Sequence, residues 1–371
     1  MALIMGWRVG AGQAAAAARP GRHALAHASL LGLLAGLLIG APLAARAQGI
    51  GEETLHIQGP LKGLRLGLRH AAASNAATSN AATSNAAGRP VVLILHGAAV
   101  PVSGNPDYPF GGRSMMTALA QSGLDVWALD YYGFGESDRY AEMAQPADAH
   151  PPLGTAEECA DQVDSVVAYL KREHQVGPIM LLGDSGGTLV AGVFATRHPE
   201  AVSRLVLFGP VTPFTGGPDS RSAIPAYSLI TPLDLWTQFS RWSEAAGEPS
   251  VLDSSAYQAW ADTYLRSDPT SGTRTPPSIK FPNGRQADLA AIAQGRFTYD
   301  PGLIRAPTLI VMGEWDEIAT FAGAEWLLQS LRQAPERRLV VIGHASHTIQ
   351  FEKERTQLYR VLTEFFNERA P

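Results

Sequence analysis

The chain has 371 residues, of which 46% are hydrophobic and 17% charged, enough for one large α/β domain with an insertion. Its formal net charge is -5 at pH 7 and it has no run of basic residues, which argues against nucleic acid as a partner. A single cysteine, Cys159, excludes an intramolecular disulfide, and we expect it to be a small buried side chain on a helix.

Residues 1–47 have the composition of an export signal. They contain four arginines and no acidic residue, and an uncharged apolar run from Ala28 to Ala41 precedes the A-x-A cleavage pattern Ala45-Arg46-Ala47. The run is short for a membrane span. We therefore expect cleavage after Ala47, a periplasmic or secreted bacterial protein, and no stable membrane span afterwards; the alternative is an uncleaved anchor. The amino terminus of the exported protein, expected at Gln48, tests this prediction.

Two strand-like segments, 54–57 and 64–70, open the remainder of the chain. The pattern S-N-A-A-T/G then occurs three times between Ser74 and Gly88. A period of five fits neither a helix nor a strand, and the residues are small and polar. We predict a flexible loop over residues 71–88.

From residue 91 onward, apolar runs typical of buried parallel strands alternate with helix-like segments. The apolar runs lie at 91–95, 125–129, 179–182, 204–208, 308–312 and 339–342. Helical segments are predicted at 113–122, 155–174, 321–334 and 352–369. Thr155 and Glu158 have the spacing of a capping box. With the two earlier segments, this pattern predicts an eight-stranded, mostly parallel, doubly wound α/β sheet.

Residues 213–302, which we call the cap, interrupt this alternation. They are rich in Pro, Ser, Thr and aromatic residues, and we interpret them as a helical insertion between two parts of the core, 48–212 and 303–371. The aromatic side chains have two possible roles: to form the cap's own core, or to line an apolar substrate pocket. The candidates for the pocket are Trp236, Trp242, Tyr257 and Trp260.

The pentapeptide Gly183-Asp184-Ser185-Gly186-Gly187 lies between a predicted strand and a predicted helix, the context in which a G-x-S-x-G motif indicates a nucleophile. We call these five residues the elbow. A sharp turn there would expose the Ser185 hydroxyl next to the first free N–H groups of the following helix. Similar residues surround the serine of chymotrypsin-like proteases. Those proteins have disulfides and the chain order His, Asp, Ser, which this chain does not offer.

Together with four other motifs, the elbow resembles the α/β-hydrolases, in the branch with a helical cap after the sixth strand. The other motifs are His96-Gly97, Asp130-x-x-Gly133-Phe134-Gly135-x-Ser137, Gly313-Glu314-x-Asp316 and Ser346-His347-Thr348-Ile349-Gln350-Phe351-Glu352. They occur in the family's order over about residues 50–371. The resemblance implies the order nucleophile, acid, histidine, which Ser185, Asp316 and His347 supply.

A serine hydroxyl needs a base within hydrogen-bond reach, and the base must be oriented by a carboxylate. Asp316 follows a predicted strand at the carboxyl edge of the sheet, where sites in such sheets lie. Glu314 is the second candidate for the acid and Asp219 the third. His347 matches the family's catalytic loop, and His344 is the alternative base.

A tetrahedral intermediate also needs donors for its oxyanion. The expected donors are the backbone N–H groups of Ala98 and Gly186. His96, Asp130 and Ser137 are expected to hold their loops in place. The sequence shows no metal-ligand spacing and no phosphate-binding or dinucleotide fingerprint, so no metal and no cofactor are expected.

These features predict a serine hydrolase that cleaves an acyl bond of a small molecule through an acyl-enzyme. A carboxylic ester of apolar or aromatic character is the favoured substrate. An aminopeptidase or amidase, a lactonase and a carbon–carbon bond hydrolase use the same residues and remain alternatives. Outside the enzymes, the alternative is a non-catalytic binding protein of this fold, since a fold does not determine a substrate. No motif indicates the oligomeric state.

Overall fold

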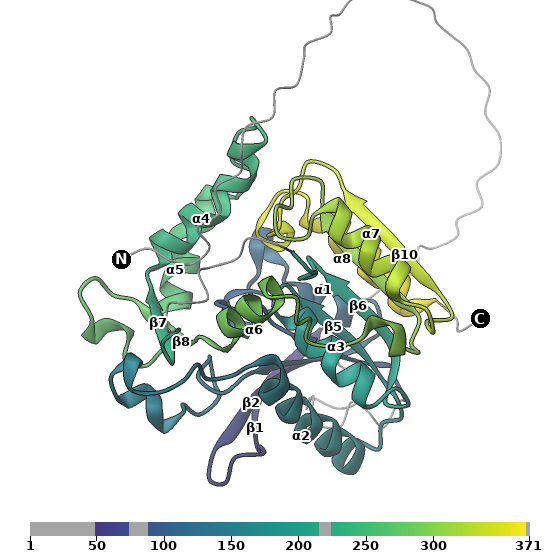
Figure 1. Cartoon of the computed structure of the whole chain (residues 1–371), viewed down its shortest axis with the longest axis horizontal. Coiled ribbons are helices and arrows are strands. Elements are labelled where there is room, and N and C mark those ends of the chain that lie inside the picture. Colours follow the sequence, from purple (N-terminus) through teal and green to yellow (C-terminus); the bar gives the residue numbers. More distant parts are fainter. Residues whose placement is uncertain (1–48, 74–87, 215–223, 369–371) are drawn as a thin grey trace, which may run out of the picture. The chain divides into compact units, whose positions relative to one another are not determined.

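The structure is a computed structural model that describes residues 49–73, 88–214 and 224–368 (Figure 1). All of these residues belong to one compact unit, residues 48–371. The expected signal peptide, most of the repeat loop and Asp219 lie outside the described residues, so the predictions made for them stay predictions.

An eight-stranded sheet forms the centre of this unit (Figure 1). Its strands are β1 (Ile50–Gln58), β2 (Arg65–Ala73), β3 (Val91–Leu95), β4 (Asp125–Asp130), β5 (Ile179–Asp184), β6 (Val202–Phe208), β9 (Thr308–Gly313) and β10 (Arg337–Ile342). They lie in the order β1-β2-β4-β3-β5-β6-β9-β10. The β1–β2 and β2–β4 pairs are antiparallel and the other pairs are parallel. The predicted eight-stranded, mostly parallel sheet is confirmed.

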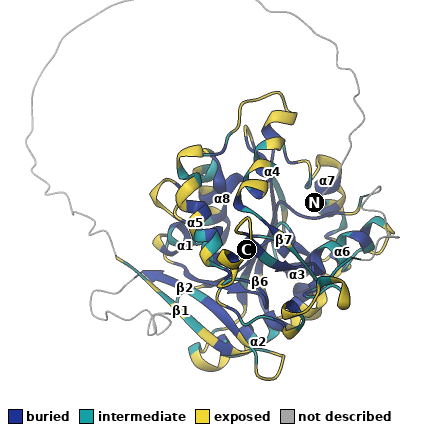
Figure 2. Cartoon of the chain, turned by 90° about the vertical axis from the view of Figure 1, so that its left-hand side faces the viewer, coloured by how far each residue is buried: buried dark blue, intermediate teal, exposed yellow. Residues whose placement is uncertain are grey.

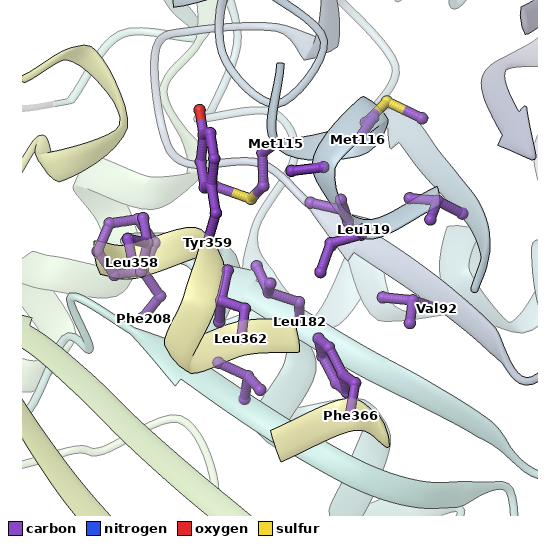
Figure 3. Packing of buried hydrophobic residues seen from close by; sticks show 14 of the residues in the cluster. Val92, Met115, Met116, Leu119, Leu182, Phe208, Leu358, Tyr359, Leu362 and Phe366 are labelled. Atoms are coloured by element: carbon purple, nitrogen blue, oxygen red, sulfur yellow. The ribbon is translucent and has the colours of Figure 1, made fainter. Parts of the chain in front are cut away.

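Helices cover both faces of the sheet. They are α1 (Met115–Gln121), α2 (Ala156–His174), α3 (Gly187–Arg197), α7 (Phe321–Ser330) and α8 (Arg355–Asn367). On one face, α1 and α8 pack together, and Leu119 and Leu362 join Val92 and Leu182 of the strands in a buried cluster (Figure 3). Side chains alternate along a strand, so buried neighbours such as Leu181 point to the other face, where α2 and α3 contact each other.

At the edge of the sheet, strand β2 extends into the loop predicted over residues 71–88. Figure 2 shows β1 mostly in the colours of partly buried and exposed residues, whereas β2 beside it is largely buried. The loop predicted over residues 71–88 starts too early, because 71–73 belong to β2. Ala71 pairs with Glu52 of β1 and with Val126 of β4, so hydrogen-bonded strands on both sides hold these small residues in the sheet.

Helix α2 begins as predicted. The Thr155 hydroxyl accepts the N–H of Glu158, and the Glu158 carboxylate accepts the N–H of Thr155 at 2.8 Å, which completes the capping box. Cys159 lies buried on this helix, as expected. Helix α8 starts three residues later than predicted. The Glu352 carboxylate accepts the N–H of Ser346, and this hydrogen bond keeps residue 352 in the preceding loop.

The described part of the cap contains α4 (Pro232–Ala245), α5 (Tyr257–Arg266) and α6 (Gly284–Ala293). It also contains two antiparallel strands, β7 (Tyr227–Ile230) and β8 (Ile279–Pro282), which the helical interpretation missed. Four-residue strands separated by 48 residues leave no periodic signal in the sequence. Among the described residues, no helix is both long enough and apolar enough to span a membrane.

Candidate active site

The elbow joins β5 to α3 in a backbone conformation that few residues adopt. Ser185 has φ 51°, in the left-handed region, and its N–H donates to the Phe208 carbonyl at 2.8 Å. A Cβ at Gly183 would lie 2.6 Å from the Gly187 carbonyl oxygen, so the turn closes only with glycine at Gly183. The strained turn presents the serine side chain at the carboxyl edge of the sheet.

Three loops bring Ser185, His347 and Asp316 into one hydrogen-bonded chain. The Nε2 atom of His347 lies 2.8 Å from Ser185 Oγ, and its Nδ1 atom lies 2.9 and 3.0 Å from the two Asp316 oxygens. The carboxylate is itself held by the N–H groups of Ile318 and Ala319, at 2.9 and 2.8 Å. With Nδ1–H directed at Asp316, Nε2 is left to accept the serine proton.

The electrostatics of His347 suit a base. Burial alone lowers the pKa of this imidazole, but the negative charge of Asp316 and its hydrogen bond outweigh burial and raise the pKa above its ordinary value. Asp184 and Glu352 also favour the charged form. The imidazole is therefore a stronger proton acceptor than an isolated buried histidine.

Only glycine fits at position 209, directly after β6. The sequence did not reveal this requirement. Gly209 has φ 54°, and a Cβ there would lie 2.9 Å from His347 Cε1 and 3.5 Å from Asp316 Oδ2. Any side chain would meet the imidazole. The available signal was a glycine directly after a predicted strand that ends beside the elbow.

Glu352 organises the loop that carries His347. Its carboxylate accepts the N–H of Ser346 at 3.0 Å, the Ser346 hydroxyl, and the Thr348 hydroxyl at 3.1 Å. Burial raises the pKa of Glu352, against the effect of these hydrogen bonds. The two residues on either side of His347 are thus fixed by one buried carboxyl group.

The alternative acid, Glu314, binds the backbone of the alternative base, His344, and not its imidazole. The Glu314 carboxylate accepts the backbone N–H of His344 at 2.9 Å, and His344 packs its ring against Trp315. Neither side chain has a hydrogen bond to Ser185 or His347 among the described residues.

The N–H groups of Ala98 and Gly186 lie side by side next to the serine. A Cβ at Gly97 would lie 3.2 Å from Ser185 Cβ, and one at Gly186 would lie 3.5 Å from the nitrogen of Ala98. Within the described chain, neither N–H donates to another protein group. Both are therefore available to an oxygen atom of a bound molecule.

His96 holds the loop that carries Ala98. Its Nδ1–H donates to the Gly97 carbonyl at 2.7 Å, and its Nε2 accepts the N–H of Tyr131 at 3.4 Å. Burial lowers the pKa of His96 to about 3, so the ring is neutral and can both donate and accept.

Residues 86–354 match the family model described as serine aminopeptidase, S33. The chain belongs to this family of α/β-hydrolases. Over 280 residues it is 27% identical to 2-hydroxymuconate semialdehyde hydrolase of Pseudomonas sp. strain CF600, covering 72% of this chain and 83% of that protein. A stretch of 95 residues is 35% identical to the α/β-hydrolase domain-containing protein VTE7 of Arabidopsis thaliana, covering 26% of this chain and 25% of that protein.

Among solved structures, a serine hydrolase from the polyaromatic hydrocarbon-degrading bacterium Cycloclasticus zankles superimposes with a TM-score of 0.59 and 18% identity. The match covers 85% of this chain and 98% of that structure. It supports the α/β-hydrolase fold.

This α/β-hydrolase has a further buried carboxyl group next to its serine, which the sequence analysis did not single out. Burial raises the pKa of Asp184 to about 6, although the charge of His347 opposes the shift. The amide nitrogen of Asn105 donates to Asp184 at 2.6 Å, and that of Gln350 at 3.4 Å. Asp184 thus connects the elbow to the histidine loop.

The four aromatic residues considered for a pocket occupy different places. Trp242 of α4 presents its ring to His347, with ring centroids 5.2 Å apart. Trp260 of α5 is fully buried and donates its indole N–H to the Gly104 carbonyl at 2.9 Å, so it has no exposed surface for a substrate to contact. Trp236 is half-buried between Tyr257 and Trp260. Of the four, Trp242 alone has a ring contact with Ser185, His347 or Asp316 among the described residues.

No group of three or more His, Cys, Asp and Glu side chains in the described part of the α/β-hydrolase is placed to hold a metal ion.

Proposed function

We propose that this α/β-hydrolase cleaves an acyl bond through a covalent acyl-enzyme, with Ser185 as the nucleophile. The observation that carries the proposal is the hydrogen-bonded chain from Ser185 through His347 to Asp316, at 2.8 Å and 2.9 Å, beside two unused backbone N–H groups. A binding protein has no need for a serine hydroxyl aligned with a buried and oriented imidazole.

In the proposed acyl transfer, each residue of the site has a role. As Ser185 Oγ bonds to the substrate carbonyl carbon, its proton passes to His347 Nε2, and Asp316 stabilises the resulting imidazolium. The N–H groups of Ala98 and Gly186 bind the oxyanion. When the tetrahedral intermediate collapses, the bond to the leaving group breaks and His347 returns the proton to that group. Water then repeats the sequence on the acyl-enzyme and releases the acid.

A carboxylic ester of apolar or aromatic character is the substrate class we propose. The cap places the ring of Trp242 against His347, and the ring of Phe239 stacks on Trp242 with the ring centroids 5.8 Å apart. An apolar group next to these rings gains about 25 cal/mol for each Å² that it buries. An ester also has a better leaving group than an amide, so its cleavage requires less transition-state stabilisation by the enzyme.

Carbon–carbon bond hydrolysis is the second candidate. The observation that favours it is the 27% identity, over 280 residues, to a 2-hydroxymuconate semialdehyde hydrolase. The two candidates differ in the leaving group, an alkoxide or a carbanion. A substrate panel separates them.

The proposal predicts that phenyl and short acyl esters are hydrolysed with a higher kcat/KM than an aminoacyl anilide, a lactone or a 1,3-diketone, in which cleavage of a carbon–carbon bond releases a stabilised carbanion. The measurement is initial rates over substrate concentration for each compound with the same enzyme preparation. Faster cleavage of the diketone or of the anilide would replace the ester proposal by the corresponding alternative.

The same panel tests Trp242. We expect Trp242→Ala to lower kcat/KM for benzoyl esters by about tenfold while it spares acetyl esters of the same alcohol. The variant removes one apolar contact surface for a bulky acyl group, and a loss of about 1.4 kcal/mol corresponds to tenfold. The matched control is Trp326→Ala, in a partly exposed tryptophan of α7 with no ring contact to the active-site residues. An equal loss on both ester types would assign Trp242 to packing alone.

A further inference from the structure

A four-residue segment of the cap packs closely against the core at positions occupied by glycine. We call Pro282–Arg285, the junction of β8 and α6, the clamp. A Cβ at Gly133, after β4, would collide with the ring of Pro282, and a Cβ at Gly284 would collide with the backbone of Gly154, just before α2. The clamp therefore contacts two core loops at distances that only glycine allows.

The last residue of the clamp reaches the elbow. A Cβ at Gly186 would lie 3.0 Å from Cδ and 3.3 Å from Cγ of Arg285, and 3.5 Å from the nitrogen of Ala98. The methylene groups of Arg285 thus pack directly on the glycine that carries one of the two free N–H groups. Arg285 is 5% exposed, so this contact is inside the protein.

The other end of the Arg285 side chain is held by a cap carboxylate that also binds the core. Its Nη1 donates to Asp288 at 2.7 Å, and the same carboxylate oxygen accepts the N–H of Ala156, at the start of α2, at 2.8 Å. The guanidinium also lies over the ring of Tyr131, 5.7 Å from its centroid. The charge therefore holds the methylene groups in one place instead of leaving them free to change rotamer.

We propose that Arg285 is a positioning residue for the oxyanion donor at Gly186. The inference rests on the proposed function, since it assigns Arg285 a role in the same acyl transfer. Backbone hydrogen bonds of Ser185, Thr188 and Leu189 hold the turn, and because Gly186 has no side chain, packing by Arg285 adds a constraint on the direction of its N–H. Donors must sit within tenths of an ångström of the developing oxyanion, and a displacement of about 1 Å costs up to about 100-fold in rate.

The test compares Arg285→Ala, Arg285→Met and Arg285→Lys with the control Arg274→Ala. Arg274 is also an arginine of the cap in an ion pair, with Asp268 at 2.8 Å, but it lies outside the clamp. The readouts are kcat and KM for p-nitrophenyl acetate, and the inhibition constant of phenylboronic acid, whose tetrahedral adduct with a serine places an oxygen at the oxyanion position. Melting temperature records any general loss of stability.

We expect Arg285→Ala to lower kcat about 10- to 100-fold and to leave KM within about twofold of the parent value. The inhibition constant of phenylboronic acid should rise by a similar factor. Arg285→Met, which keeps a side chain of similar length without the anchor at Asp288, should lose kcat about tenfold in the same selective way. If Arg285→Ala does not fold, the Arg285→Met variant tests the role of Arg285. Arg285→Lys retains methylene groups and a cation for Asp288, and should stay within about threefold of the parent enzyme.

Arg274→Ala should change the melting temperature but neither kcat nor the boronate affinity. Parent-like kcat and boronate affinity in Arg285→Met, or an equal loss in Arg274→Ala, would overturn the role of Arg285. A parent enzyme that neither hydrolyses the ester nor reacts with a fluorophosphonate would instead contradict the proposed function itself.

Discussion

Ser185→Ala should lower kcat by about 10⁴- to 10⁶-fold and abolish covalent labelling by a fluorophosphonate probe. The reason is that the imidazole 2.8 Å from the hydroxyl would have no proton to accept, and no acyl-enzyme could form. The fold should persist, because alanine is smaller than serine and the backbone turn remains bound to Phe208 through its N–H. The measurements are kcat on the preferred ester, probe labelling followed by mass spectrometry, and melting temperature.

Ser203→Ala is the matched control for this variant. Ser203 is an exposed serine on β6, so its loss should change neither labelling nor turnover. Near-normal activity in Ser185→Ala, or probe attached to another residue, would place the chemistry elsewhere. A labelled peptide that contains Ser185 in the parent enzyme identifies the nucleophile directly.

Asp316→Asn should lower kcat by about 10⁴-fold, although the side chain keeps its shape. An amide that donates to His347 Nδ1 stabilises the tautomer with the proton on Nε2, which cannot accept the serine proton. The carboxylate in the parent enzyme accepts from Nδ1 with both oxygens and favours the productive tautomer. Single-turnover kinetics on an activated ester measure the loss at the acylation step.

The same variant should shift the pH profile. His347 acts as a neutral base, so activity falls as the pH drops through the pKa of this imidazole. Asp316 raises that pKa in the parent enzyme, so its neutral replacement should move the acidic limb of the residual activity to lower pH. Asp184 and Glu352 remain in the variant and still raise the pKa of His347. The control is Glu314→Gln, which removes a carboxylate that binds only the His344 loop, and a larger loss there than in Asp316→Asn would reverse the assignment.

Local patterns were sufficient to predict the elements that hold Ser185, His347 and Asp316. Each of these residues directly follows, or lies in the loop after, an apolar strand that is readable by itself, and parallel strands bring such loops to one edge. The choice of Asp316 and His347 over Glu314 and His344 came from the resemblance to the α/β-hydrolases, and the sheet order of the structure brings the three residues together. This is why the predicted residues lie together in the structure.

The residues that were missed act through contacts between distant segments. Gly209 is needed only because His347, 138 residues later, occupies the space where its side chain would be. The β7–β8 pair and the Arg285–Gly186 contact likewise join segments whose own sequences give no periodic signal. Position along the chain does not encode such proximities. The sequence reveals why a glycine is required only when the residues that require it lie nearby in the chain, as they do at the elbow.

The way the cap is attached limits how this enzyme can diversify. Bonds from α5 to the loop after β3, through Trp260 to Gly104 and Tyr264 to Ala99, add to the contacts of the clamp with Gly133 and Gly186. Recombination that imported a foreign cap would have to bring a matching clamp, or else change these core glycines at the same time. Point changes on α4, which carries Trp242, leave these glycine contacts in place. New specificities in this lineage should therefore arise by substitutions on α4 more readily than by exchange of whole caps, and directed evolution has its most productive starting point there.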